Sequence, residues 1–193
     1  MRRFLLWPFG ILYGTVASLL RRYAEIKGRK TPSVFTVVVG NLAIGGTGKT
    51  PLIIQLTEEL LKKELSVAVL SRGYGRKTKG FYALHENSLA SEVGEEPLEI
   101  YKQTKVPVYV CEDRLEGIKK MAPKVDILLL DDGFQHLPLK AHFTIVLDNA
   151  KMPFYKNAVL PAGSLREFPS VLKGANAIVF TKTQPSFNHT EGF

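Results

Sequence analysis

Short apolar runs recur along most of the chain, separated by amphipathic stretches. Several of these runs are continuously apolar rather than alternating, as in strands that are buried on both faces of a parallel sheet. They are rich in β-branched residues, which favour strands. The pattern predicts a mostly parallel sheet whose strands cover residues 34–39, 66–70, 106–110, 125–130, 143–147 and 177–181.

Between the first two runs, the apolar positions change to a helical period. Leu52, Leu56 and Leu60 recur every four residues, which places them on one face of a helix over residues 51–63. Strands and helices in alternation predict an α/β fold with three layers, in which helices flank the sheet on both sides. Ligands of such folds bind at the carboxyl ends of the strands. Further helices are predicted over residues 97–103 and 114–121.

The N-terminal segment is mostly apolar from residue 4 to residue 20, with aromatic side chains along it and an arginine pair at each end. It is shorter than the about 20 residues that usually span a bilayer, and a proline and two glycines interrupt it. These features are typical of a helix that lies in the membrane interface, so we expect peripheral association. A secretory signal, with small residues at Thr15 and Ala17, and a helix packed on the protein's own core are the alternatives.

Composition indicates a folded domain with a basic surface. Of the 193 residues, 45% are hydrophobic and 23% are charged, which argues against wholesale disorder. The formal net charge is +8, and basic residues gather in the N-terminal segment and again between Arg72 and Lys79. Such clusters suit a membrane surface, a nucleic acid or a phosphorylated substrate. Cys111 is the single cysteine, which excludes an internal disulfide and a multi-cysteine zinc site.

A glycine-rich stretch lies between the first predicted strand and the first predicted helix behind it. This is the context that a phosphate-binding P-loop requires, because backbone amides and the helix N-terminus then converge on phosphate oxygens. We expect Lys49 to reach the β- and γ-phosphates of ATP and the Thr50 hydroxyl to bind Mg²⁺. The loop residues are Ala43, Ile44, Gly45, Gly46, Thr47, Gly48, Lys49 and Thr50.

A carboxylate partner for the metal is expected next to this loop. The apolar run at 125–130 ends in Asp131 and Asp132, and a strand-terminal aspartate beside the P-loop strand is the usual partner. Adjacent residues of an extended chain point to opposite sides, so at most one of the two faces the metal if the strand persists. His136 is expected near the same cleft. At Ile44 the loop lacks the additional lysine of membrane-associated partition ATPases, which argues against an ATP-sandwich dimer, and we expect a monomer.

Five motifs follow one another along the chain: GNLAIGGTGKTP, LSRGYGRKTKG, EDR at Glu112–Arg114, LLLDDGFQH and LPAGSLRE. In this order, over nearly the whole chain, they closely resemble the tetraacyldisaccharide 4′-kinases, the lipid A kinases of Gram-negative bacteria. The resemblance implies ATP- and Mg²⁺-dependent phosphorylation of the 4′-hydroxyl of an acylated disaccharide 1-phosphate. It places the protein on the cytoplasmic face of the inner membrane, as a peripheral protein with no nucleic-acid partner.

The resemblance also implies roles for individual residues. A packing or surface role is the alternative for Arg114 and Arg166. The expected catalytic residues are Lys49, Glu95, Asp131, Asp132 and His136. The expected metal ligands are Thr50, Glu96, Asp131 and Asp132. The expected substrate-binding residues are Arg72, Tyr74, Arg76, Arg114 and Arg166.

Two departures from the family pattern stand out. The family has Gly-Asp-Glu-Pro where this chain has Gly94-Glu95-Glu96-Pro97. Glu95 adds a methylene to the carboxylate thought to assist the attacking hydroxyl, and a misplacement near 1 Å can cost on the order of 10²-fold in rate. Family members also continue into a smaller C-terminal lobe. We therefore expect an interfacial helix over 1–28 and a P-loop kinase core over 29–193 without that lobe. A nucleotide-binding membrane module without turnover is the alternative to an active kinase.

Overall fold

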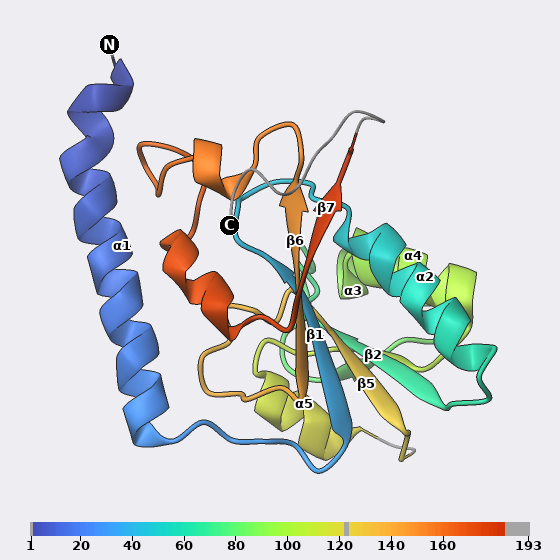
Figure 1. The fold of residues 1–193 in the computed structure, drawn as a ribbon. Coiled ribbons are helices and arrows are strands. Elements are labelled where there is room, and N and C mark those ends of the chain that lie inside the picture. The colour runs from blue at the N-terminus through green and yellow to red at the C-terminus, as the bar shows by residue number, and fades with distance from the viewer. Residues whose placement is uncertain (1, 122–123, 184–193) are drawn as a thin grey trace.

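The computed structural model describes residues 2–121 and 124–183, so the end of the predicted segment 29–193 lies outside the described residues. The described chain folds around one seven-stranded sheet in the order β3-β4-β2-β5-β1-β6-β7 (Figure 1). The strands are β1 (Phe35–Asn41), β2 (Val67–Ser71), β3 (Tyr82–Ala83), β4 (Val108–Val110), β5 (Ile127–Asp131), β6 (Phe143–Asn149) and β7 (Ala177–Thr181).

Helices cover both faces of this sheet. On one face α2 and α4 pack on a core that includes Val39, Ile53 and Leu129. On the other face α5 and two short 3₁₀ helices pack on a core that includes Val38 and Phe134. The predicted three-layer α/β fold with a mostly parallel sheet is thus confirmed. The helices are α1 (Arg2–Lys27), α2 (Lys49–Leu61), α3 (Ala90–Val93), α4 (Glu95–Thr104), α5 (Arg114–Lys120), η1 (Phe154–Lys156) and η2 (Pro169–Gly174).

Strand β1 is central and sets the position of the site. It pairs in parallel with β5 on one side and β6 on the other, with Val39 opposite Asp131 and Asn41 opposite Leu147. The carboxyl ends of these strands therefore meet at one edge of the sheet, where the P-loop leaves β1 (Figure 1). Only β3 runs antiparallel to its neighbour among the described strands, and neither β3 nor α3 was predicted, because both are too short to show a period.

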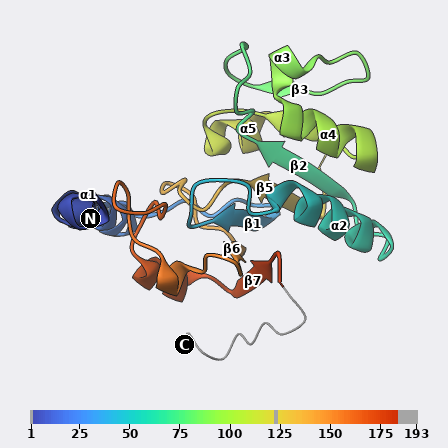
Figure 2. The same cartoon turned by 90° about the horizontal axis from the view of Figure 1, so that it is seen from above.

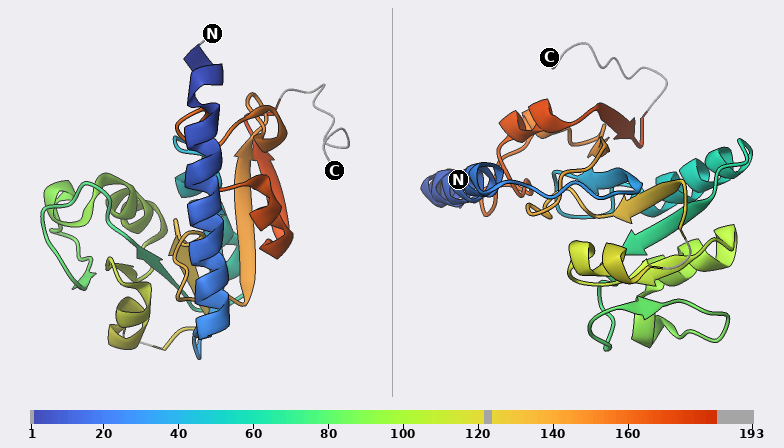
Figure 3. Two further views of the ribbon diagram at one scale, coloured as in Figure 1. Left: turned by 90° about the vertical axis from the view of Figure 1, so that its left-hand side faces the viewer. Right: turned by 90° about the horizontal axis from the view of Figure 1, so that it is seen from below.

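Helix α1 packs through small residues and exposes large apolar ones. Gly10 and Gly14 are buried, and a Cβ on Gly14 would lie 2.6 Å from the ring of Phe168. Figure 2 and Figure 3 show α1 at one side of the molecule, away from α2 and α4. Within the described residues, no helix is long and apolar enough to cross a membrane. The exposed apolar side chains of α1 are Leu5, Leu6, Trp7, Phe9, Ile11, Leu12, Tyr13, Val16, Leu19, Leu20, Tyr23 and Ile26.

Candidate active site

The glycine-rich loop connects the end of β1 to the first turn of α2. Gly45 and Gly48 have φ angles of 114° and 82°, which only glycine adopts without strain. A Cβ on Gly45 or Gly46 would meet nothing within 4 Å, so the loop backbone faces open space. Lys49 and Thr50 begin α2, where the positive end of the helix dipole favours an anion. This is the geometry that the sequence predicts for a P-loop.

Asn41 holds this loop in place through hydrogen bonds of its side chain. Its side chain is fully buried, and its Nδ2 donates to the carbonyls of Ala43 at 2.7 Å and Gly45 at 3.3 Å. Its Oδ1 accepts from Lys49 Nζ at 3.4 Å. Sequence analysis missed Asn41, although a polar residue at the end of an otherwise apolar strand was the available signal.

Two later segments also hold the loop in place. The Ile44 amide donates to the Ser164 carbonyl at 2.8 Å. From the end of β7, Thr181 Oγ1 donates to the Thr47 carbonyl at 2.9 Å, and Lys182 Nζ donates to the Gly46 carbonyl at 2.8 Å. The loop conformation is therefore fixed by hydrogen bonds to residues more than a hundred positions away in the sequence.

Asp131 lies at the carboxyl end of β5, next to β1. It is 2% exposed, and its Oδ2 accepts from Ser71 Oγ at 2.8 Å, whereas its Oδ1 has no hydrogen-bond partner among the described residues. The pKa of Asp131 is raised to about 6, chiefly by burial; the Ser71 hydrogen bond opposes this rise, and the nearby carboxylates of Glu96 and Asp132 add to it. A buried carboxylate oxygen without a partner is costly unless a cation or water satisfies it.

Asp132 does not continue the strand. Its φ of 52° is left-handed, so the extended geometry that would separate the two aspartates ends at Asp131. Asp132 Oδ1 lies 3.6 Å from Lys49 Nζ, and Lys49 also lowers the pKa of Asp131. The strand does not persist beyond Asp131, so the two aspartates need not point to opposite sides of an extended chain. Both carboxylates lie near Lys49.

Arg166 completes this cluster from a distant loop. Its Nη1 lies 3.4 Å from Asp132 Oδ2 and donates to Gln135 Oε1 at 3.1 Å. Gln135 in turn donates from Nε2 to the Asn41 carbonyl at 3.0 Å. The structure thus brings Arg166 to the site, together with Gln135, which sequence analysis did not single out.

Two of the predicted substrate arginines are instead bound to the protein's own backbone and to the EDR motif. The Arg76 side chain is 2% exposed and forms an ion pair with Glu112 of the EDR motif at 2.8 Å. The next residue of that motif, Asp113, caps the N-terminus of α5. Arg114 is 3% exposed and donates to the carbonyls of Cys111 at 3.1 Å and Asp131 at 3.2 Å. For Arg114 this geometry favours the packing role, and Arg76 likewise holds its loop rather than facing the P-loop.

The remaining predicted residues lie in the loop behind β2 and at the start of α4. Arg72 and Tyr74 are exposed, Tyr74 by 89%, in a loop that packs against Gly94, where a Cβ would lie 3.0 Å from the Tyr74 carbonyl. Behind Gly94, Glu95 and Glu96 begin α4 and are exposed.

His136 is half-buried on the same side. Burial, and then the charge of Arg114, lowers the pKa of His136, and Arg72 contributes in the same direction. Its Nε2 has no hydrogen-bond partner in the described part of the chain. Among the described residues no hydrogen bond or ion pair joins His136 to Lys49 or Asp132, and the charges that act on its pKa include those of Arg114 and Arg72.

Comparisons with known proteins identify the family of this arrangement. The sequence profile described as tetraacyldisaccharide-1-P 4′-kinase matches residues 2–192. The tetraacyldisaccharide 4′-kinase of Cytophaga hutchinsonii is 44% identical over 189 residues, covering 94% of this chain and 53% of that protein. That of Actinobacillus pleuropneumoniae is 38% identical over 190 residues, covering 94% of this chain and 58% of that protein.

A solved structure agrees with these relatives. The crystal structure of LpxK from Aquifex aeolicus in complex with ATP superposes with a TM-score of 0.85 at 34% identity, covering 97% of this chain and 61% of that one. This chain spans about half the length of the curated relatives that it matches. The match to the family profile nonetheless runs over nearly every residue, and the chain therefore belongs to the tetraacyldisaccharide 4′-kinase family.

Proposed function

We propose that this chain transfers the γ-phosphoryl group of ATP to the 4′-hydroxyl of a tetraacyldisaccharide 1-phosphate. The observation that carries the proposal is the position of Lys49, whose Nζ lies between Asn41 Oδ1 and Asp132 Oδ1 at the open P-loop. A cation at this place neutralises charge that develops on a transferring phosphoryl group. The family relationship and the ATP-bound Aquifex aeolicus structure support the same activity.

The chain's own residues fit a magnesium ion at this edge. The unpartnered Asp131 Oδ1 is an oxygen ligand of the kind that Mg²⁺ prefers, and the carboxylates of Asp132 and Glu96 are near enough to raise the pKa of Asp131. Thr50, Asp132 and Glu96 are proposed as the further ligands. Bound Mg²⁺ would supply charge neutralisation between the β- and γ-phosphates.

The acceptor hydroxyl is proposed to approach from the side of Glu95. The Glu95 carboxylate begins α4 and is exposed, so it could orient the hydroxyl or take its proton. Arg166 is proposed to stabilise charge on the transferring group, because it already lies at Asp132. Arg72 and Tyr74 are the exposed candidates for binding the sugar or its phosphate.

We further propose that α1 holds the chain in the membrane interface, on the cytoplasmic face of the inner membrane, as a monomer. The support is the row of exposed large apolar side chains, which includes Trp7, Leu12 and Leu19 at 55%, 65% and 60% exposure. Such a row is costly in water and favourable at an acyl boundary. The same placement would bring an acylated substrate to the carboxyl edge of the sheet.

Substitution of Lys49 tests the kinase proposal. Lys49→Ala should abolish ATP-dependent 4′-phosphorylation of the acylated disaccharide in mixed micelles while leaving the fold intact, since alanine is a good helix former. Lys63→Ala, an exposed lysine behind the far end of α2, is the matched control and should keep the activity. Transfer by the Lys49 variant at the unsubstituted rate would refute the proposal. Binding of ATP without any transfer by the unsubstituted chain would favour the non-catalytic module instead.

A further inference from the structure

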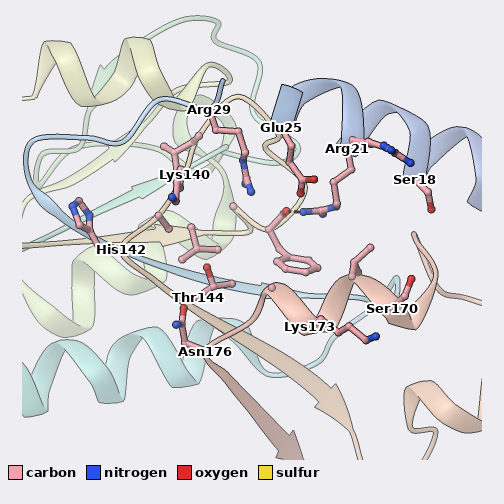
Figure 4. A pocket seen from close by; sticks show the side chains of 18 residues that line it. Ser18, Arg21, Glu25, Arg29, Lys140, His142, Thr144, Ser170, Lys173 and Asn176 are labelled. Atoms are coloured by element: carbon pink, nitrogen blue, oxygen red, sulfur yellow. Dashed lines mark hydrogen bonds between the residues drawn. The ribbon is translucent and has the colours of Figure 1, made fainter. Parts of the chain in front are cut away.

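A basic cavity lies between α1 and η2, away from the P-loop. It has a volume of about 710 Å³ and is bounded by the second half of α1, the segment behind β5 and the turn of η2 (Figure 4). Thr144 and Asn176, which lie at the amino ends of β6 and β7, form its floor. Because the P-loop occupies the carboxyl ends of the strands, this cavity is separate from the site of transfer.

Cations dominate the lining. Arg21, Arg22, Arg29, Lys140 and Lys173 line the cavity, together with a single carboxylate, Glu25. Arg21 is neutralised by Glu167 at 2.7 Å, but no ion pair is formed by Arg22, Lys140 or Lys173 within the described chain. The cavity therefore carries an excess of positive charge, which attracts an anion.

Two of these cations are held in place before any ligand binds. Arg21 donates from both Nε and Nη2 to the Glu167 carboxylate at 2.7 Å, and Arg29 Nε donates to the Leu137 carbonyl at 2.9 Å. Figure 4 shows Arg21, Arg29 and Lys140 around the same space, with Ser170 on the opposite wall. Guanidinium groups that are already fixed in this way lose little entropy on binding, and the N–H groups that these bonds leave free match phosphate oxygens in geometry.

The position of the cavity indicates where the anion comes from. The turns of α1 that supply Arg21, Arg22 and Glu25 also expose Leu19, Tyr23 and Ile26, at 60%, 62% and 78%. If those apolar side chains enter an acyl layer, the cavity lies at the depth of the headgroups. This step rests on the proposed interfacial placement of α1.

We propose that this cavity binds the phosphate of an anionic membrane lipid, as an accessory site distinct from the site of phosphoryl transfer. The lipid would fix the chain on the membrane through its headgroup, while the exposed side chains of α1 contact the acyl chains. The apolar part of the lining, which includes Val38, Phe134 and Val171, would contact the glycerol and the first methylenes of the chains.

The test compares a cavity variant with a control of equal charge. The cavity variant carries Arg22→Gln, Lys140→Gln and Lys173→Gln; all three side chains are exposed, so the fold is expected to persist. The control carries Lys63→Gln, Lys102→Gln and Lys105→Gln, which lie at the ends of α2 and α4 or beyond. No nucleotide or acceptor is added, so failure of the kinase proposal would not affect the result.

The first probe is a short-chain phosphatidylglycerol below its critical micelle concentration, titrated by calorimetry. We expect saturable binding that the cavity variant weakens at least tenfold and the control retains, and no binding of short-chain phosphatidylcholine. In co-sedimentation with vesicles of equal parts phosphatidylcholine and phosphatidylglycerol, the cavity variant should likewise bind more weakly than the control. An equal loss in both variants, or a loss in neither, would overturn the proposal. Saturable binding of inorganic phosphate without any binding of the short-chain lipid would assign the cavity to a soluble phosphate and overturn the lipid assignment.

Discussion

At the scale of single residues, the candidate site depends on carboxylates in unequal environments. Asp131 is buried and has one oxygen without a partner, whereas Glu95 and Glu96 are exposed at the start of α4. A buried carboxylate close to other carboxylates suits a cation, and an exposed one next to the cleft suits contact with a mobile acceptor. The environment, rather than the residue type, distinguishes the cation-binding role proposed for Asp131 from the acceptor-binding role proposed for Glu95.

The pKa of Asp131 predicts how stability depends on pH. Its folded value of about 6 lies above the ordinary 3.8, so the folded state binds this proton more tightly, and stability falls as pH rises from about 4 to about 6. The loss should reach up to about 3 kcal/mol at neutral pH. Asp131→Asn should remove this fall, so urea unfolding of the metal-free protein at pH 5 and pH 7.5 should show a smaller difference for the variant. Parallel pH profiles for the two proteins would contradict the assignment.

Glu95 gives a kinetic prediction. Glu95→Gln keeps nearly the same shape but cannot accept a proton. The kcat for phosphoryl transfer should therefore fall by roughly 10²–10⁴-fold, with little change in ATP affinity. Glu99→Gln, on the exposed face of the same helix, is the control. Glu95→Asp should keep or raise the activity if the loop backbone matches the family, and lower it if the backbone suits the longer side chain. An unchanged kcat in the Gln variant would transfer the role to Asp131 or Asp132.

At the scale of elements, α1 is joined to the domain by small residues and by the ion pair between Arg21 and Glu167. Arg21 and Glu167 are 13% and 6% exposed, and Arg21 also lies 4.9 Å above the ring of Phe134. Glu167 directly follows Arg166, which contacts Asp132. The helix proposed to meet the membrane is therefore connected to the phosphoryl site through two adjacent residues.

This ion pair should behave as a buried pair in a double-mutant cycle. Arg21→Met alone, and Glu167→Gln alone, should each lower the free energy of unfolding by about 3–5 kcal/mol, because each leaves an uncompensated buried group. The double variant should cost less than the sum of the two. The exposed pair Lys62–Glu59, with side chains 68% and 56% exposed, is the control and should show little coupling, because solvent screens it. Additive losses at Arg21 and Glu167 would show that the two are not coupled.

At the scale of the whole molecule, the arrangement separates two surfaces. The P-loop lies at the carboxyl ends of the strands, and α1 runs along one side of the domain (Figure 1), with its row of exposed apolar side chains. An amphiphilic acceptor could thus keep its acyl chains in the membrane while its sugar reaches the P-loop.

The apolar row predicts membrane binding that survives high salt. Replacement of Leu5, Leu12 and Leu19 by Asn should release the protein from phosphatidylcholine vesicles, since apolar burial is not screened by ions. The fold should persist, because these side chains are 74%, 65% and 60% exposed, and the unfolding free energy should fall only by the lower helix propensity of Asn. The control for co-sedimentation carries Leu61→Asn and Leu89→Asn. These leucines lie outside α1 and are 41% and 60% exposed. Binding unchanged by the substitutions in α1 would show that the helix has a structural role only.

Local patterns in the sequence were sufficient for the strands other than β3 and for the position of the glycine-rich loop between β1 and α2, because each depends on neighbours in the chain. The roles of Arg76 and Arg114 were not accessible in this way: both side chains are bound by groups that the fold brings to them. Ser71 and Gln135 were missed for the same reason, whereas Asn41 had a local signal, its position at the end of an apolar strand. The left-handed turn at Asp132 depends on tertiary packing that no periodicity reports.

The central place of β1 has a consequence for synthesis of the chain. Both of its partners, β5 and β6, follow it by many residues, beginning at Ile127 and Phe143. At about 5–20 residues per second, β1 waits on the order of 4–17 seconds on the ribosome before its first partner is made. During that time an apolar strand of seven residues has two unpaired edges, which is a template for aggregation. The soluble yield should therefore depend on what shields this strand during translation more than on the stability of the finished sheet.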